Sequence, residues 1–225
     1  MIRIGVLASG SGSNLQALLD AVREGRIDGE VAAVVCNVPG ARALERARVA
    51  GVQAELLPSK GITDREAYDH QVVSRLRAHG VDLVCLAGWM RIVTPTFLDA
   101  FGPTAAGKDC PRVMNVHPSL LPSFPGLHAQ RQALHYGVRF TGCTVHFVDP
   151  GTDTGPVIVQ AAVPVLQGDD EAALSARILV EEHRIYPLAV QWYAEGRLEV
   201  HGRRVRLRDA AGPMLDGVTN PSGDR

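Results

Sequence analysis

The strongest constraint on the fold is the alternation of strand and helix patterns in the first half of the sequence. Ile2–Ala8 is an almost continuous apolar run, which is typical of a strand covered on both faces of a sheet, and leucines at helical spacing follow it in residues 14–23. Further strands are expected at 31–36, 53–57, 83–87 and 113–116, and further helices at 41–50, 63–79 and from Thr94 onwards. Repeated β-α-β units make a parallel sheet with helices on both faces. The pattern predicts a Rossmann-like α/β fold with an open twisted sheet.

The second half is less regular. Residues 141–148 and 157–163 are expected as strands, and Leu198–His201 and 205–208 flank a Gly202-Arg203 turn, which predicts a terminal hairpin. A long helix is expected from 170 to 185, with Pro187 breaking or kinking it before a shorter helix. The sheet is therefore expected to be mostly parallel, with antiparallel strands in this half. A single domain is predicted for 1–208, followed by a loosely ordered tail, 209–225.

Composition excludes several classes of protein. The 225 residues carry a net charge of -1, which does not fit a nucleic-acid-coating protein. No apolar run reaches the roughly 20 residues that a membrane span needs, and the N-terminus lacks the pattern of a signal peptide. The four cysteines form no C-x-x-C pair and the histidines no metal spacing, so we expect no metal site and a reducing, cytoplasmic location. The cysteines are Cys36, Cys85, Cys110 and Cys143.

A glycine-rich loop follows the first strand, at residues 9–16 (SGSGSNLQ). Glycines let the backbone approach a ligand closely, and the helix that follows offers free N–H groups to an anion. A dinucleotide fingerprint would need Gly or Ala where Leu15 stands, and a phosphate loop of the Walker type would need Gly-Lys-Ser/Thr. The loop therefore favours a phosphomonoester over NAD or ATP. The alternative is a helix-capping turn of small residues.

Asn115 and His117 lie two residues apart at the carboxyl end of the strand expected at 113–116, so they share one face. Open α/β sheets bind ligands at this end of their strands. An amide can donate a hydrogen bond to a developing oxyanion, and an imidazole can donate or move a proton. The pair therefore predicts chemistry at a carbonyl. A structural hydrogen bond is the alternative for a histidine at such a place.

A second glycine-containing loop, residues 149–156, follows a later strand. Asp153 is expected to orient His117 and to favour its protonated form, since an adjacent carboxylate stabilises imidazolium. A turn stabilised by the aspartate side chain is an equal alternative, and Asp149 fits the same role by composition.

Taken together, these motifs resemble the folate-dependent formyltransferases, and most closely the members that act on glycinamide ribonucleotide. The resemblance covers residues 2–200, and its most specific parts are residues 10–16 (GSGSNLQ), 87–92 (AGWMRI), 115–122 (NVHPSLLP) and 153–156 (DTGP). It implies direct formyl transfer from 10-formyltetrahydrofolate, as co-substrate, to the glycinamide amine, without a metal or a covalent enzyme intermediate. It also implies that Asn115 and His117 contact the formyl oxygen and that Asp153, in preference to the turn alternative, supports His117.

The resemblance extends to the binding residues. It places the substrate phosphate on Gly12, Ser13 and Asn14. It implies folate contacts for Arg65, Met90, Arg91, Ile92, Val93 and Asn115. Glu182 resembles a residue that contacts the glycinamide, and a solvated helix face is its alternative.

Residues 102–112 form a longer connection than compact members of the family have, and we expect a surface insertion there. The alternative activities are a 10-formyltetrahydrofolate hydrolase and a methionyl-tRNA formyltransferase. These relatives carry a further N-terminal or C-terminal domain, for which we expect no room in this chain, and the charge offers no basic surface for RNA. A non-catalytic nucleotide-binding module would explain the glycine loop alone. The expected partners are the two small-molecule substrates, with no nucleic acid and no membrane, and a homodimer is left open.

Overall fold

The computed structural model describes residues 1–103, 110–209 and 219–220. The chain divides into two compact units, Met1–Asn115 and Val116–Arg225. The single domain expected for 1–208 stays a prediction. Most of the tail expected at 209–225 and the middle of the insertion expected at 102–112 lie outside the described residues.

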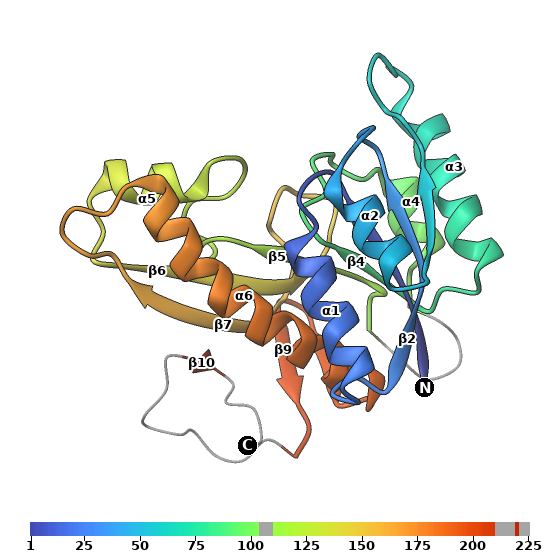
Figure 1. Cartoon of the computed structure of the whole chain (residues 1–225). Helices are drawn as coiled ribbons and strands as arrows, with labels where there is room; N and C mark the ends of the chain where they lie inside the picture. Colours follow the sequence, from blue (N-terminus) through green and yellow to red (C-terminus); the bar gives the residue numbers. More distant parts are fainter. Residues whose placement is uncertain (104–109, 210–218, 221–225) are drawn as a thin grey trace. The chain divides into compact units, whose positions relative to one another are not determined.

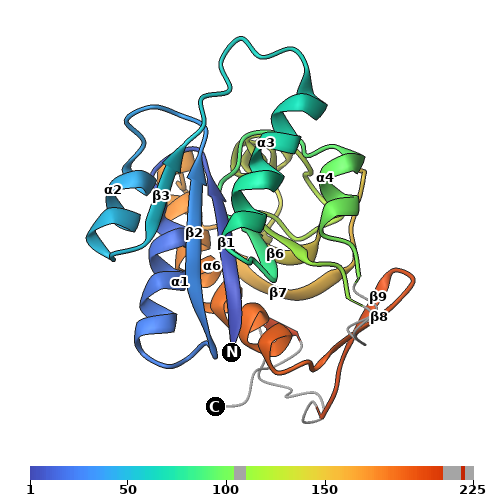
Figure 2. The same cartoon turned by 90° about the vertical axis from the view of Figure 1, so that its right-hand side faces the viewer.

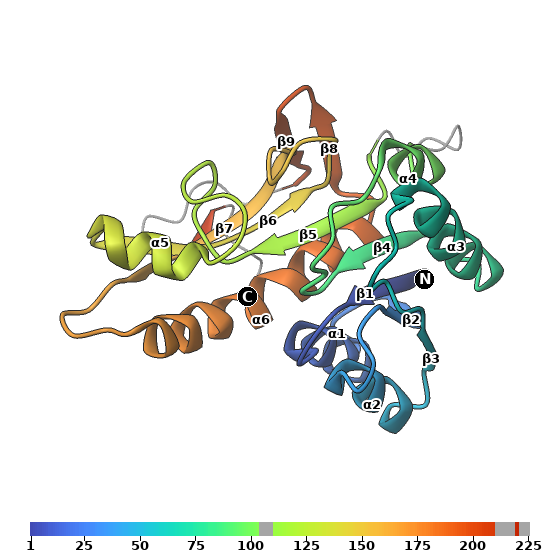
Figure 3. The same cartoon turned by 90° about the horizontal axis from the view of Figure 1, so that it is seen from above.

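The first unit is a parallel sheet with helices on both faces. Its strands are ordered β3-β2-β1-β4-β5 and every neighbouring pair is parallel. Helices α1 and α2 cover one face, and α3 and α4 cover the other (Figure 2, Figure 3). The elements are β1 (Ile2–Ala8), α1 (Ser13–Arg23), β2 (Gly29–Cys36), α2 (Arg42–Val49), β3 (Gln53–Leu56), α3 (Arg65–Ala78), β4 (Leu83–Leu86), α4 (Pro95–Ala100) and β5 (Val113–His117), whose last two residues belong to the second unit.

The strand order explains where the first glycine loop lies. The chain moves outwards from β1 to β3 and then returns to the other side of β1 with β4. Neighbouring connections leave the sheet in opposite directions at such a reversal, and a crevice opens at the carboxyl ends of the strands. The loop after β1 lies at this point. Strand β1 itself is apolar because it is central in the sheet, and Ile4, Val6 and Leu7 have no solvent exposure.

The second unit contains the antiparallel strands. Strand β6 (Phe140–Phe147) pairs antiparallel with β7 (Val157–Pro164), and β8 (Leu198–His201) forms a hairpin with β9 (Arg204–Leu207). The short strand β10 (Thr219–Asn220) pairs antiparallel with β7. Helix α6 (Glu171–Ala194) packs along β6 and β7, and the shorter α5 (Ala129–Tyr136) packs against α6 (Figure 1). The predicted fold class, a mostly parallel α/β sheet with antiparallel strands in the C-terminal half, is confirmed.

The break expected at Pro187 is absent, because helix α6 runs from Glu171 to Ala194 without interruption. A proline inside a helix costs about 3 kcal/mol through its missing N–H and its clash with the preceding turn. The same stretch buries Tyr186 and Trp192 almost completely, and burial of a large apolar side chain stabilises by about 1.5–3 kcal/mol. Tertiary packing of this face therefore outweighs the local preference of proline.

Two further local predictions differ from the structure. A helix was expected from residue 63, but α3 begins at Arg65 with Asp64 as its N-cap, whose Oδ1 accepts a hydrogen bond from Ala67 N at 2.9 Å. Asp64 stands one residue closer to the helix, so its carboxylate reaches the free amide three residues later. The sequence pattern also missed helix α5, which has only eight residues and buries only two of them, Ala129 and Ala133.

Candidate active site

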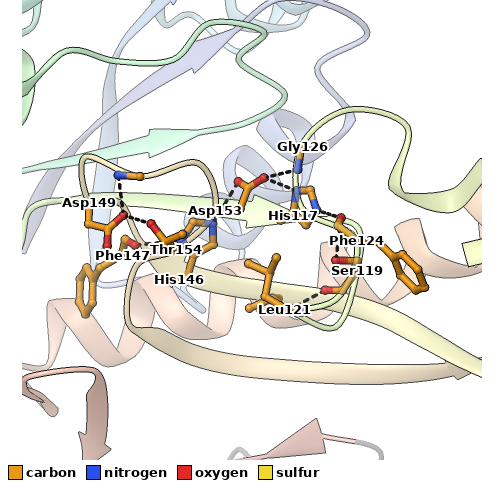
Figure 4. A network of polar contacts seen from close by, with 12 residues as sticks. His117, Ser119, Leu121, Phe124, Gly126, His146, Phe147, Asp149, Asp153 and Thr154 are labelled. Carbon is orange, nitrogen blue, oxygen red and sulfur yellow. Dashed lines mark hydrogen bonds and ion pairs between the residues drawn. The ribbon is translucent and has the colours of Figure 1, made fainter. Parts of the chain in front are cut away.

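His117 is the last residue of β5 and its side chain is buried, at 5% exposure. Asn115 precedes it on the same face of the strand and is partly exposed. The sequence motif therefore lies as expected, at the carboxyl end of a parallel strand. Figure 4 shows the polar side chains around the imidazole.

Both ring nitrogens of His117 face oxygen atoms that only accept hydrogen bonds. Nε2 lies 2.9 Å from the carbonyl oxygen of Phe124, and Nδ1 lies 3.3 Å from Oδ2 of Asp153 (Figure 4). A neutral imidazole carries a proton on one nitrogen only, so one of these contacts would set two lone pairs against each other. The arrangement therefore suits the doubly protonated, positively charged ring.

Asp153 and Asp149 have different partners, although composition alone made them equivalent. Oδ2 of Asp153 accepts a hydrogen bond from Gly126 N at 2.8 Å beside its contact with His117. Oδ1 of Asp149 accepts hydrogen bonds from Gly151 N at 3.1 Å and from Thr154 Oγ1 at 2.6 Å, so Asp149 stabilises the turn of its own loop. Asp153 adopts a left-handed backbone with φ 54°, which non-glycine residues rarely adopt. The fold accepts this conformation at the residue that meets the histidine.

His146 is a site residue that the sequence analysis missed. It is 2% exposed on β6, its Nε2 lies 3.8 Å from Oδ1 of Asp153, and its Nδ1 donates to the carbonyl of Phe147 at 2.8 Å. Burial lowers the pKa of His146 below its ordinary value of 6.5, although the Phe147 carbonyl and the Asp153 carboxylate oppose the shift. A neutral His146 therefore lies on the other side of the carboxylate from His117. The signal in the sequence is the polar alternation of Thr144 and His146 on an otherwise apolar strand.

A network of hydrogen bonds holds the 118–125 loop, which carries the Phe124 carbonyl that faces His117. Ser119 Oγ donates to the Ser123 carbonyl at 2.5 Å and lies 3.3 Å from the Phe124 carbonyl. The Ser119 carbonyl accepts from Thr144 Oγ1 at 2.7 Å. Gln160 Nε2 donates to Thr144 Oγ1 and to the Leu121 carbonyl, both at 2.9 Å. Phe124 is itself left-handed, with φ 54°. Strands β6 and β7 thus hold a loop that local preference alone would not hold.

In the first unit, the glycine loop enters α1 through Gly12, which is left-handed with φ 68°. A left-handed residue followed by a helix turns successive N–H groups to one side, as in anion-binding nests. Among the described residues, the N–H groups of Ser11, Gly12 and Ser13 donate no hydrogen bond. Asn14 follows as a buried residue in the first turn of the helix. The loop thus has the free donors that a phosphate group needs.

The segment expected to hold folate connects β4 to α4 in the first unit. Met90 and Ile92 are exposed, at 66% and 54%, whereas Val93 is buried. Arg65 Nη2 donates to the Ile92 carbonyl at 2.8 Å, and the Arg91 guanidinium lies 4.3 Å from the centre of the Tyr68 ring. Arg65 therefore supports this segment through its backbone, and apolar side chains of the segment are left open to solvent.

Glu182 lies in α6 and is 6% exposed, so its side chain does not lie on a solvated helix face.

Within the described part of the chain, no three His, Cys, Asp or Glu side chains gather in a way that could hold a metal ion, and the cysteines are buried free thiols. No described helix has the length and apolarity that a membrane crossing needs.

Comparison with known proteins shows which family the chain resembles. The formyl transferase family matches residues 2–190. Phosphoribosylglycinamide formyltransferase of Escherichia coli (strain K12) is 47% identical over 200 residues, which are 89% of this chain and 91% of that protein. The human trifunctional purine biosynthetic protein adenosine-3 is 42% identical over 198 residues, but these are only 19% of its length.

A solved structure agrees with these matches. The crystal structure of glycinamide ribonucleotide transformylase 1 from Symbiobacterium toebii superposes with a TM-score of 0.87 at 58% identity, and it covers 92% of this chain and 94% of that one. Sequence and structure thus agree over nearly the same stretch. The chain therefore belongs to the formyl transferase family and is itself a formyltransferase.

Proposed function

We propose that this chain transfers the formyl group of 10-formyltetrahydrofolate to the amine of N1-(5-phospho-D-ribosyl)glycinamide, in purine biosynthesis. The products are the N-formyl nucleotide and tetrahydrofolate. The observation that carries the proposal is the His117 imidazole held between the Asp153 carboxylate and the Phe124 carbonyl, at the end of a strand that also bears Asn115. The names of the relatives support the nucleotide as acceptor, and the family resemblance implies the folate donor.

The proposed reaction is a direct transfer. The glycinamide amine attacks the formyl carbon, a C–N bond forms, and negative charge develops on the formyl oxygen. Asn115 donates a hydrogen bond to that oxygen, and protonated His117 donates the second. When the bond to the folate nitrogen breaks, a proton leaves the attacking amine and a proton reaches the leaving nitrogen, so charge balances. Donors aimed at a developing oxyanion act strongly in a buried site, where water does not screen them.

His117 has a specific task in this scheme. In the structure its Nε2 proton is directed at the Phe124 carbonyl. We propose that the formyl oxygen takes the place of that carbonyl as acceptor during transfer, while Asp153 keeps the ring charged through Nδ1. The change exchanges one hydrogen bond for another, and the bond to an oxyanion is the stronger of the two. His117 then stabilises the transition state more than the ground state, which is what catalysis requires.

The binding roles follow the family resemblance. We assign the substrate phosphate to the N–H groups of Gly12, Ser13 and Asn14. Glu182 is assigned to the glycinamide, whose ammonium or amide N–H groups suit a carboxylate. We assign the folate to Arg65, Asn115 and the segment Met90, Arg91, Ile92 and Val93, whose exposed apolar side chains suit a flat ring system. We also propose a cytoplasmic location, in keeping with a purine-biosynthetic reaction.

One assay separates the candidate activities. The protein is incubated with 10-formyltetrahydrofolate, with and without glycinamide ribonucleotide, and tetrahydrofolate release is followed. Release only with the nucleotide is the expected result. Release without it would favour the hydrolase, and formylation of methionyl-tRNA in its place would favour the tRNA enzyme. No release with any acceptor would favour a binding module and would overturn the proposal.

A further inference from the structure

The glycine loop between β1 and α1 is fixed at three points to the start of α2. The Gly10 carbonyl accepts a hydrogen bond from Ala43 N at 3.2 Å. A Cβ atom on Gly12 would lie 2.8 Å from the Ala43 Cα, so glycine is needed for this close approach. Arg46 Nε donates to the Ser11 carbonyl at 2.9 Å. Two successive carbonyls of the loop are therefore directed at α2.

This anchoring determines where the N–H groups of the loop point. In a planar trans peptide the carbonyl of one residue and the N–H of the next point in opposite directions. Because the carbonyls of Gly10 and Ser11 are held by α2, the N–H groups of Ser11 and Gly12 are turned away from it. Among the described residues these N–H groups have no acceptor. The contacts that hold the carbonyls thus set the direction of the free donors.

Arg46 holds both sides of the loop with one guanidinium. Besides the Ser11 carbonyl, which precedes α1, its Nη1 donates to Oε1 of Gln16 at 3.0 Å. Gln16 lies in the first turn of α1, where its N–H donates to the Gly12 carbonyl at 2.9 Å. The guanidinium is planar and its donors keep a fixed spacing. The distance between the loop and the first turn of the helix is therefore set by a rigid group.

We propose that Arg46 is the positioning residue of the phosphate-binding loop, holding the Ser11 carbonyl and the Gln16 side chain so that the loop presents its N–H groups to a phosphomonoester. The proposal rests on the proposed function only in taking this loop as the phosphate site. Arg46 acts through the backbone and does not need to touch the substrate. Its loss should therefore affect substrates that carry the phosphate and spare the chemistry of formyl transfer.

The test uses two variants at this position and one matched control. Arg46→Gln removes both the positive charge and the planar guanidinium with its paired N–H donors. Arg46→Lys keeps the charge but lacks the guanidinium. Arg48→Gln removes the same charge from an exposed position two residues further along α2, where the side chain makes no hydrogen bond or ion pair to a described residue. Binding of ribose 5-phosphate is measured by calorimetry. Transfer is measured with glycinamide ribonucleotide and with the same compound lacking its phosphate.

We expect Arg46→Gln to raise the dissociation constant for ribose 5-phosphate about tenfold, the scale of one charge-assisted hydrogen bond. KM for the nucleotide should rise by a similar factor, with kcat and the KM for folate nearly unchanged. The compound lacking phosphate should react equally well with wild type and variant. Arg46→Lys should recover only part of the affinity, and Arg48→Gln should behave like wild type.

Several results would overturn this role. Equal losses of activity with the nucleotide and with the compound lacking phosphate would mean a general structural defect. Equal effects of Arg46→Gln and Arg48→Gln would mean that only overall positive charge matters. Full recovery of affinity in Arg46→Lys would show that the guanidinium geometry is not needed. Absence of ribose 5-phosphate binding in the wild type would remove the site itself. If the wild type binds ribose 5-phosphate but transfers no formyl group, the proposed function fails while the comparison of variants still tests Arg46.

Discussion

Replacing Asp153 by asparagine should isolate the charge of the carboxylate from its hydrogen bonds. Oδ2 accepts a hydrogen bond from Gly126 N and lies 3.3 Å from Nδ1 of His117, and the carbonyl oxygen of an asparagine can occupy the same place. Oδ1 faces Nε2 of His146, whose proton is on Nδ1, so an amide NH₂ placed there meets an acceptor. Asp153→Asn therefore keeps the local hydrogen-bond pattern and removes one negative charge beside the imidazolium.

The size of the effect follows from that difference. A hydrogen bond with one charged partner contributes about 1.5–3 kcal/mol, and a neutral one about 0.5–1.5 kcal/mol. Loss of the charge should then weaken the support of the imidazolium by about 1.4 kcal/mol, which is a factor of about ten in turnover.

The assay is kcat at one fixed pH for wild type, Asp153→Asn and Asp149→Asn, with both substrates saturating. Asp149→Asn is the matched control, because Asp149 lies in the same loop and bonds only within its turn among the contacts described. It should keep the wild-type turnover, even if its loop is less stable. Unchanged turnover in Asp153→Asn would refute the reasoning and leave Asp153 as a turn residue.

Three further predictions concern the same chain. His117→Ala should lower turnover by about 10²–10⁴ under saturating conditions, and near-normal turnover would remove its assignment as acid–base group. Ser119→Ala should lower the free energy of unfolding in urea by about 0.5–1.5 kcal/mol, since it removes the hydrogen bond from the hydroxyl to the Ser123 carbonyl. An unchanged midpoint would show that water replaces the hydroxyl. Hydrogen bonding from Arg177 holds the pKa of the Asp169 carboxyl below its usual 3.8. The ion pair therefore stabilises the fold above pH 3.8, and this stabilisation is lost as the pH falls through the lowered pKa of Asp169. In urea titrations from pH 7 downwards, Asp169→Asn should lose less stability with acid than wild type, and parallel losses would show that the pair contributes nothing.

The arrangement around His117 also shows how the fold serves the proposed chemistry. The imidazole has an acceptor from its own loop on one side and an acceptor from the loop after β6 on the other. Both loops contain a left-handed residue at the contact, Phe124 and Asp153 respectively. Such conformations cost about 1–3 kcal/mol each and persist only where surrounding contacts hold them. The network of Ser119, Thr144 and Gln160 supplies those contacts for the first loop.

The sequence by itself determined the features that depend on neighbouring residues. Apolar runs at strand length and helical spacing predicted the parallel sheet, and the glycine loop and the Asn115–His117 pair were placed correctly at strand ends. These inferences rest on periodicity and on the backbone preferences of glycine and proline, which act over a few residues. The assignment of a formyltransferase came from several such motifs occurring together in one chain.

Only the tertiary structure decided between groups that are equivalent locally. Asp149 and Asp153 were alike by composition, yet one bonds within its turn and the other meets His117. No sequence motif singled out Arg46, yet its guanidinium bonds to a loop 35 positions earlier in the chain. Pro187 was expected to break or kink its helix, yet the helix runs unbroken through it, where burial of its neighbours outweighs the local preference. In each case the deciding contacts join residues distant in sequence, and their free energies exceed the local preferences from which a sequence is read.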